Sequence, residues 1–160
     1  MSSFASKLVG PMGLVVLVCF FLPWMTVSCS GMEIISDVTA FDIAQGIEAQ
    51  GEQTDPSPDL FLILVGGAVM ALAGARLWGS RSPAASVLAL LGSGLALGIW
   101  FYFRTSTMSD IAEGASQGIV FTLRWEFGFW GTMVGALVGV LSSLLSFGSR
   151  SDGYGGIESP

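Results

Sequence analysis

The chain has 160 residues, of which 52% are hydrophobic and only 11% are charged. A soluble domain usually carries about 25% charged residues, so this chain lacks the polar surface that a globule in water needs. The net charge is −6 and only six residues are Lys or Arg, which excludes a nucleic-acid partner because phosphate contacts require many cations. The absence of His removes the commonest metal ligand and a frequent general base.

Four apolar stretches contain no charged residue, and they are 17, 16, 22 and 23 residues long: 8–24, 60–75, 82–103 and 127–149. A membrane-spanning helix needs about 20 apolar residues. The second stretch reaches this length because Arg76 can extend its charged end to the lipid headgroups, which lets a helix continue to Trp78. The fold class predicted is an all-α membrane protein, a four-transmembrane-helix bundle with helices at about 8–26, 59–78, 83–103 and 127–148.

The Lys and Arg residues predict how these helices are oriented, because cytoplasmic loops carry an excess of them. Four flank one side of the predicted membrane and two flank the other: Lys7, Arg76, Arg81 and Arg150 against Arg104 and Arg124. We therefore expect a multi-pass protein of the cell membrane with both termini in the cytoplasm, outer loops at 27–58 and 104–126, and a disordered tail at 150–160. Aromatic residues are expected to anchor the interfaces: Trp24, Trp100, Tyr102, Trp125 and Trp130 outside, and Trp78 inside.

The N-terminus has a second interpretation. Lys7, an apolar run and then Val27-Ser28-Cys29 resemble a lipoprotein signal peptide, in which Cys29 becomes the lipidated residue. Under this alternative, residues 1–28 are removed and three helices remain.

Small residues recur at steps of four, which places them on one face of a helix where backbones can approach closely. The last stretch has Gly131, Gly135, Gly139 and Ser143, and the third has Gly94 and Gly98. These positions predict a helix-packing face inside the bundle or, as the alternative, a seam for a second copy or a larger membrane complex.

The outer loops predict a small antiparallel sheet. Two β-prone runs around Ser30-Gly31 indicate a hairpin, and Thr39 with Asp42 resembles a capping box at the start of a short helix over 40–49. Residues 119–126 alternate with period two, which is typical of a strand. This strand should pair with the hairpin to complete the sheet. The candidate residues of the sheet are Cys29, Phe121, Arg124 and Trp125, with Phe121 and Trp125 facing inward and Arg124 outward.

Four spans, cytoplasmic termini, a larger first outer loop and Trp24 before a loop cysteine resemble the claudin-like tetraspan arrangement, in topology only. The chain has no Gly-Leu-Trp and one loop cysteine, so the resemblance implies no junction-forming activity. The segments FFLPWMTVSCSG (20–31) and RWEFGFWGTMVGALVG (124–139) resemble small bacterial four-helix membrane proteins of unknown function. This resemblance implies a fold and no activity.

The sequence offers no catalytic constellation. It lacks a nucleophile with a paired base, a metal-ligand spacing and a CxxC dithiol, and the acidic residues of the first loop match no calcium loop. We therefore expect no enzyme, no cofactor and no metal. The expected function is a non-catalytic structural or accessory subunit that presents its outer loops or its glycine-rich face to a membrane partner; the alternatives are an oligomeric pore, a lipid- or small-molecule-binding membrane protein, or a lipoprotein anchored through Cys29.

Overall fold

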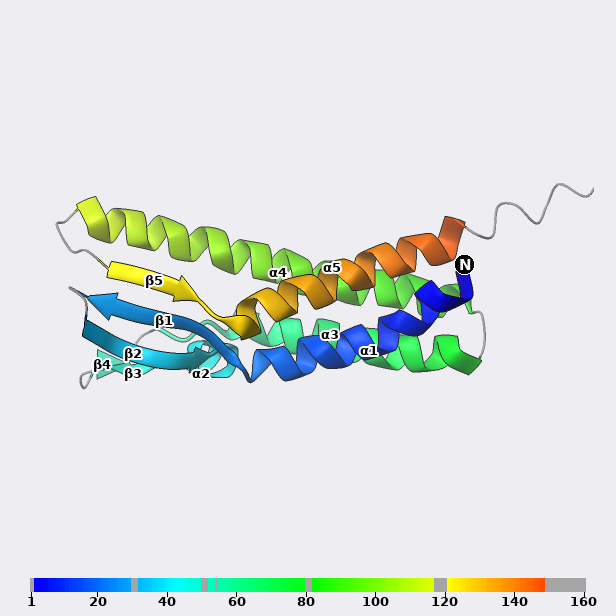
Figure 1. Cartoon of the computed structure of the whole chain (residues 1–160), viewed down its shortest axis with the longest axis horizontal. Helices are drawn as coiled ribbons and strands as arrows, with labels where there is room; N and C mark the ends of the chain where they lie inside the picture. Colours follow the sequence, from blue (N-terminus) through cyan, green and yellow to red (C-terminus); the bar gives the residue numbers. More distant parts are fainter. Residues whose placement is uncertain are drawn as a thin grey trace, which may run out of the picture.

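The computed structural model describes residues 2–29, 32–49, 52–53, 55–79, 82–116 and 121–148. Four long helices lie side by side, and each packs against two of the others: α1 and α4 both contact α3 and α5 (Figure 1). Their bounds are Ser2–Phe20 for α1, Phe61–Gly79 for α3, Pro83–Ser116 for α4 and Phe127–Gly148 for α5. Within the described residues, α3, α4 and α5 are long and apolar enough to cross a membrane, whereas the apolar part of α1, Lys7–Phe20, is shorter.

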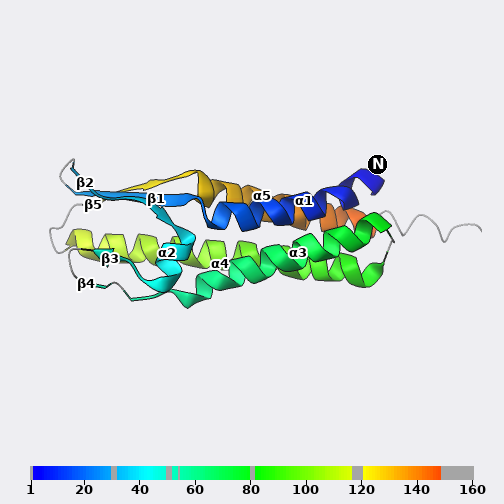
Figure 2. The same ribbon diagram turned by 90° about the horizontal axis from the view of Figure 1, so that it is seen from below.

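The elements form two layers. One layer holds α1, α5 and a three-stranded sheet, and the other holds α3, α4 and the short helix α2, Ala40–Gln45 (Figure 2). The start of α1, the end of α3, the start of α4 and the end of α5 lie together at one end, which we call the turn end (Figure 1). The sheet occupies the opposite end, which we call the sheet end.

The sheet has the strand order β2-β1-β5, with β1 at Pro23–Cys29, β2 at Met32–Thr39 and β5 at Phe121–Trp125. Both pairings are antiparallel, as the sequence predicts for the hairpin and the later strand. The β1–β5 register is regular, but β1 and β2 are paired through several bulges. One bulge contains Asp37, whose φ of 58° lies in the left-handed region that Asp tolerates better than most residues.

The first helix is shorter at its C-terminal end than predicted: α1 ends at Phe20 and not near residue 26. Pro23 disfavours helical geometry in the residue before it and has no N–H to donate, so the helix cannot run through it. The freed carbonyl of Cys19 accepts hydrogen bonds from the Leu22 amide (3.3 Å) and from the Trp24 indole Nε1 (2.9 Å). The following residues enter the sheet as its central strand.

The third long helix is longer than predicted, because α4 continues from the expected end at residue 103 to Ser116. A helix of 34 residues is about 51 Å long, well beyond the roughly 30 Å of a bilayer core. Its Ser and Thr residues bond back to helix carbonyls, as Thr107 does to Phe103 (2.9 Å) and Ser109 to Thr105 (3.1 Å). Residues 104–116, predicted from the sequence to belong to the second outer loop, are thus part of α4.

The remaining connections are compact. Thr39 caps α2 by a capping box with Asp42, as predicted, although the helix ends at Gln45 and not near residue 49. After α2, the chain forms a two-stranded pair, β3 at Glu48–Ala49 with β4 at Glu52–Gln53, and then a 3-10 turn η1, Pro58–Leu60. The predicted tail at 150–160 lies outside the described residues, as do strand residues 119 and 120.

Candidate interaction surface at the sheet end

The strands β1 and β5 build a sheet with two chemically different faces. Residues directly opposite each other project to the same side. Thr26 lies opposite Arg124 and Ser28 opposite Thr122, so one face is polar; we call these four residues the polar sheet face.

The other face is apolar and points toward the helices. Met25 lies opposite Trp125, and Val27 opposite Leu123. Met25 and Trp125 pack against the main hydrophobic core, and Val38 of β2, the partner of Met25, is buried in it. The alternation predicted for the later strand is therefore confirmed over residues 122–125.

A cluster of aromatic rings joins the sheet to the helices; we call it the aromatic junction. Trp125 stacks on Phe129 with ring centroids 4.0 Å apart and meets Phe103 at 6.3 Å. Trp24 contacts Phe103 at 5.8 Å, Phe129 at 5.6 Å and Phe20 at 6.4 Å. Trp24 and Trp125 thus share two ring partners, Phe103 of α4 and Phe129 of α5.

The expected lipid-facing anchors divide into two groups. Trp24 and Trp100 are buried, with exposed fractions of 0% and 3%, whereas Tyr102 and Trp130 are exposed. The indole of Trp100 donates to the Phe129 carbonyl (2.9 Å), and this bond ties α4 to α5. Trp24 and Trp100 are thus core residues and not interface anchors, because each finds a backbone carbonyl inside the protein for its N–H.

Charge is concentrated on the outer parts of the sheet end. The side chain of Arg124 is 81% exposed, and its Nε lies 3.4 Å from a carboxylate oxygen of Glu126, which is only 23% exposed. Arg104 lies over the ring of Trp100, 5.8 Å from its centroid. Five exposed Asp side chains belong to the elements and connections of the same end: Asp37, Asp42, Asp55, Asp59 and Asp110.

The cysteines are placed differently. Cys29 is the last residue of β1 and pairs in register with Phe121, and both side chains lie outside the described set. Cys19 is a buried free thiol in α1, opposite Gly131. Cys19 thus packs as a small buried residue between α1 and α5.

The glycines singled out from the sequence do not all lie on packed surfaces. A side chain at Gly131 would meet Cys19, one at Gly135 would meet Val16, and one at Gly139 would meet Met70. The Ser143 hydroxyl is buried and bonds to the Gly139 carbonyl (2.8 Å). These four positions face the interior of the same chain.

Gly94 and Gly98 of α4 have no other atom within 4 Å of where a Cβ would lie, and both are exposed. The face of α4 that packs against α3 instead uses Gly92, which lies against Gly66. Periodicity alone could not separate the two faces, because small residues occur on both.

Among the described residues, no three His, Cys, Asp or Glu side chains are grouped closely enough to hold a metal ion. Neither the protein-family models nor the curated proteins nor the solved structures contain a match to this chain. Its function therefore has to be inferred from its own residues and geometry.

Proposed function

We propose that the chain is an integral membrane protein in which all four long helices cross the bilayer as a four-helix bundle, with both termini on the cytoplasmic side. Exposed apolar side chains surround the helices, which is the reverse of a soluble protein: Leu14, Val18, Leu62, Val65, Leu72, Val87, Leu91, Val134, Leu137, Leu141 and Leu145. The apolar part of α1, Lys7–Phe20, is about 21 Å long, and the exposed apolar residues Phe21 and Leu22 extend it toward the roughly 30 Å of a bilayer core.

The buried polar groups fit this location. Ser93 donates to the Ala89 carbonyl (2.8 Å), and Thr132 donates to the Gly128 carbonyl (2.8 Å). Among the described residues, no buried side-chain nitrogen or oxygen lacks a hydrogen-bond partner. An unsatisfied polar group costs several kcal/mol in lipid, so this internal pairing supports helices that lie in a bilayer.

We further propose a non-catalytic function: the sheet end is a rigid platform that binds a membrane partner outside the bilayer. The observation that carries this proposal is the aromatic junction, which fixes the apolar side of the sheet to α4 and α5 and leaves the polar sheet face open. A platform held on regular elements presents its side chains in one geometry, which lowers the entropy cost of binding. Arg124 is the residue of this face best suited to a partner carboxylate.

Photo-crosslinking tests the platform. A photoreactive amino acid at Thr122, which is exposed on the polar sheet face, should yield one discrete crosslinked product in cells. The matched control is Leu137, exposed on α5 among the apolar side chains, which should give lipid adducts only. A discrete protein product from Leu137 and none from Thr122 would show that the partner binds the helices and not the sheet.

The orientation is tested separately. In a chain with Cys19 and Cys29 replaced by Ala, a Cys at Asp55 should react with a membrane-impermeant maleimide added to intact cells. A Cys at Lys7 should react only after the membrane is opened. The reversed pattern would show that the termini face outward.

The lipoprotein alternative has a structural cost. Cleavage before Cys29 would remove α1 and all of β1 except its last residue, which takes the central strand out of the sheet and Phe20 and Trp24 out of the core. We therefore expect the mature chain to retain α1. Intact-mass measurement of the purified protein decides between the two, since a lipidated form would lack residues 1–28.

A further inference from the structure

An open groove of about 600 Å³ lies between α3 and α4 at the turn end. Its walls are mostly Ala and branched apolar side chains, such as Val69, Leu72, Ala84 and Leu88. The polar members of the lining are Arg76 and Ser82. Ligand sites in proteins commonly have volumes of about 300–1,000 Å³. The groove therefore has the size of a binding site.

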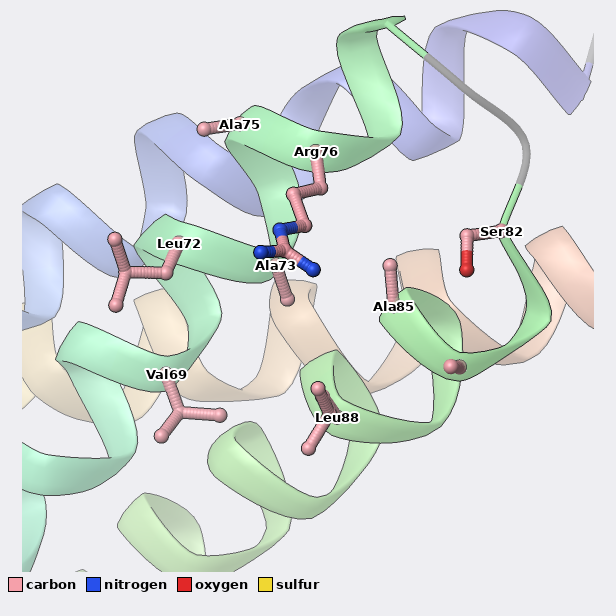
Figure 3. A pocket seen from close by; sticks show the side chains of 9 residues that line it. Val69, Leu72, Ala73, Ala75, Arg76, Ser82, Ala85 and Leu88 are labelled. Carbon is pink, nitrogen blue, oxygen red and sulfur yellow. The ribbon is translucent and has the colours of Figure 1, made fainter.

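The groove exists because of how α3 and α4 pack. The two helices meet backbone to backbone at Gly66 and Gly92, and nearer the turn their buried contact is made by small residues such as Ala73 and Ala85. These methyl groups fill the inner part of the space and leave its outer part open. Figure 3 shows Arg76 extending from α3 toward the start of α4, where Ala85 lies in the first turn and Ser82 just before the helix.

The position of the groove matches the edge of a bilayer. Val69 and Arg76 are seven residues apart on α3, so the apolar and charged ends of the groove are about 10 Å apart along the helix. Trp78, exposed two residues after Arg76, donates its indole N–H to the Lys7 carbonyl (3.1 Å), and Trp is typical of the headgroup level. One end of the groove thus lies at the headgroups and the other among the acyl chains.

The charge at this end is positive. Within the described side chains, the turn end carries Lys7 and Arg76, and the acidic residues all belong to the sheet end. The first turn of α4 also lies beside the groove, and the leading peptide N–H groups of a helix favour an anion. Basic pockets between membrane helices on the cytoplasmic side recognise anionic headgroups.

We propose that this groove binds one anionic phospholipid, with the phosphate at Arg76 and an acyl chain along Val69, Leu72 and Leu88. The inference rests on the proposed membrane location and adds a ligand to it. Arg suits a phosphate because its planar guanidinium can donate two parallel hydrogen bonds.

Native mass spectrometry tests the lipid, using the full chain in nanodiscs of equal parts phosphatidylglycerol and phosphatidylcholine. We expect the wild type to retain one phosphatidylglycerol in preference to phosphatidylcholine. Arg76→Gln should lower this preference by about fivefold, the equivalent of roughly 1 kcal/mol for one cation near the membrane surface. Arg76→Lys should keep most of it, and Arg104→Gln, which removes the same charge at the sheet end, should leave it unchanged.

A second variant tests the apolar part of the groove. Ala84 is exposed and lines the groove, so Ala84→Leu should fill it without entering the core and should reduce retention of both lipids. Gly98→Leu is the control, since Gly98 is exposed and no atom from another part of the chain lies within 4 Å of where its Cβ would be.

Three outcomes would overturn the proposal: equal retention of both lipids by the wild type, equal effects of Arg76→Gln and Arg104→Gln, or a disulfide-linked dimer of Ala84→Cys chains, which would show a second copy in the groove. A chain that does not enter nanodiscs at all would contradict the membrane location itself.

Discussion

The cores at the two ends of the helix layers consist of different kinds of side chain. At the sheet end, Trp24, Trp100 and Phe129 fill the space between elements, and Trp24 and Phe129 are completely buried. At the turn end, the core consists of Ala73, Ala85 and Ala89 with Val9 and Leu77. Large aromatic rings fill the wider space between helices and strands, whereas small residues allow the helix backbones to approach closely.

In the proposed membrane bundle this difference has a physical reason. In lipid no hydrophobic force drives helices together, so close van der Waals contact between small residues has to hold them. Under the same proposal the elements of the sheet end meet near or outside the bilayer, where burying aromatic surface is strongly favourable. We therefore expect substitutions of opposite kinds to be harmful at the two ends.

The largest effect is expected at the aromatic junction. Trp24→Ala removes a fully buried side chain and the hydrogen bond to the Cys19 carbonyl, so it should lower the free energy of unfolding by about 3–5 kcal/mol. Trp78→Ala is the control, because that ring is 64% exposed. Equilibrium unfolding in mixed detergent micelles measures both. Equal losses would contradict a buried aromatic junction.

The next largest effect is expected where backbones touch. A Cβ at Gly74 would overlap the backbone of Gly10, which cannot move aside as a side chain could. Gly74→Ala should therefore destabilise the protein by about 1–3 kcal/mol, the usual range for overpacking. Gly94→Ala makes the same chemical change where nothing lies within 4 Å, and it should be neutral or stabilising by up to about 1 kcal/mol through helix propensity. If the two variants unfold alike, the α1–α3 contact is looser than described.

A smaller effect is expected on the sheet itself. Trp125 is half-buried and stacks on Phe129, so Trp125→Ala should cost about 2 kcal/mol, less than a fully buried ring. Limited proteolysis of the cap, together with the melting temperature, would report this loosening.

The smallest effect on stability is expected for Arg124→Ala. Its ion pair with Glu126 is largely exposed, and such pairs contribute about 0–1 kcal/mol. The melting temperature should stay nearly unchanged while crosslinking from Thr122 falls. A marked loss of stability would show that Arg124 supports the fold and is not reserved for a partner.

Helix positions, helix starts and the later strand could be predicted from the sequence, because they depend on local chemistry. The charge-free stretches located α3 and α5 almost to the residue, since apolar length is a property of each stretch alone. Pro83 marked the start of α4, the Thr39–Asp42 pair marked the start of α2, and the period-two alternation located β5. Each of these signals acts over a few neighbouring residues.

The central strand, the burial of two Trp residues and the direction of the glycine faces could not be predicted, because they depend on residues far away in the chain. The chain after Phe20 becomes the central strand because β2 and β5 pair with it from both sides. No local pattern before Pro23 predicts this pairing. Trp24 and Trp100 look like interface anchors in the sequence, yet rings from other elements bury them. Gly94 and Gly139 look alike as members of small-residue patterns, but one faces outward and the other faces Met70, because the direction of a helix face is set by what the helix packs against.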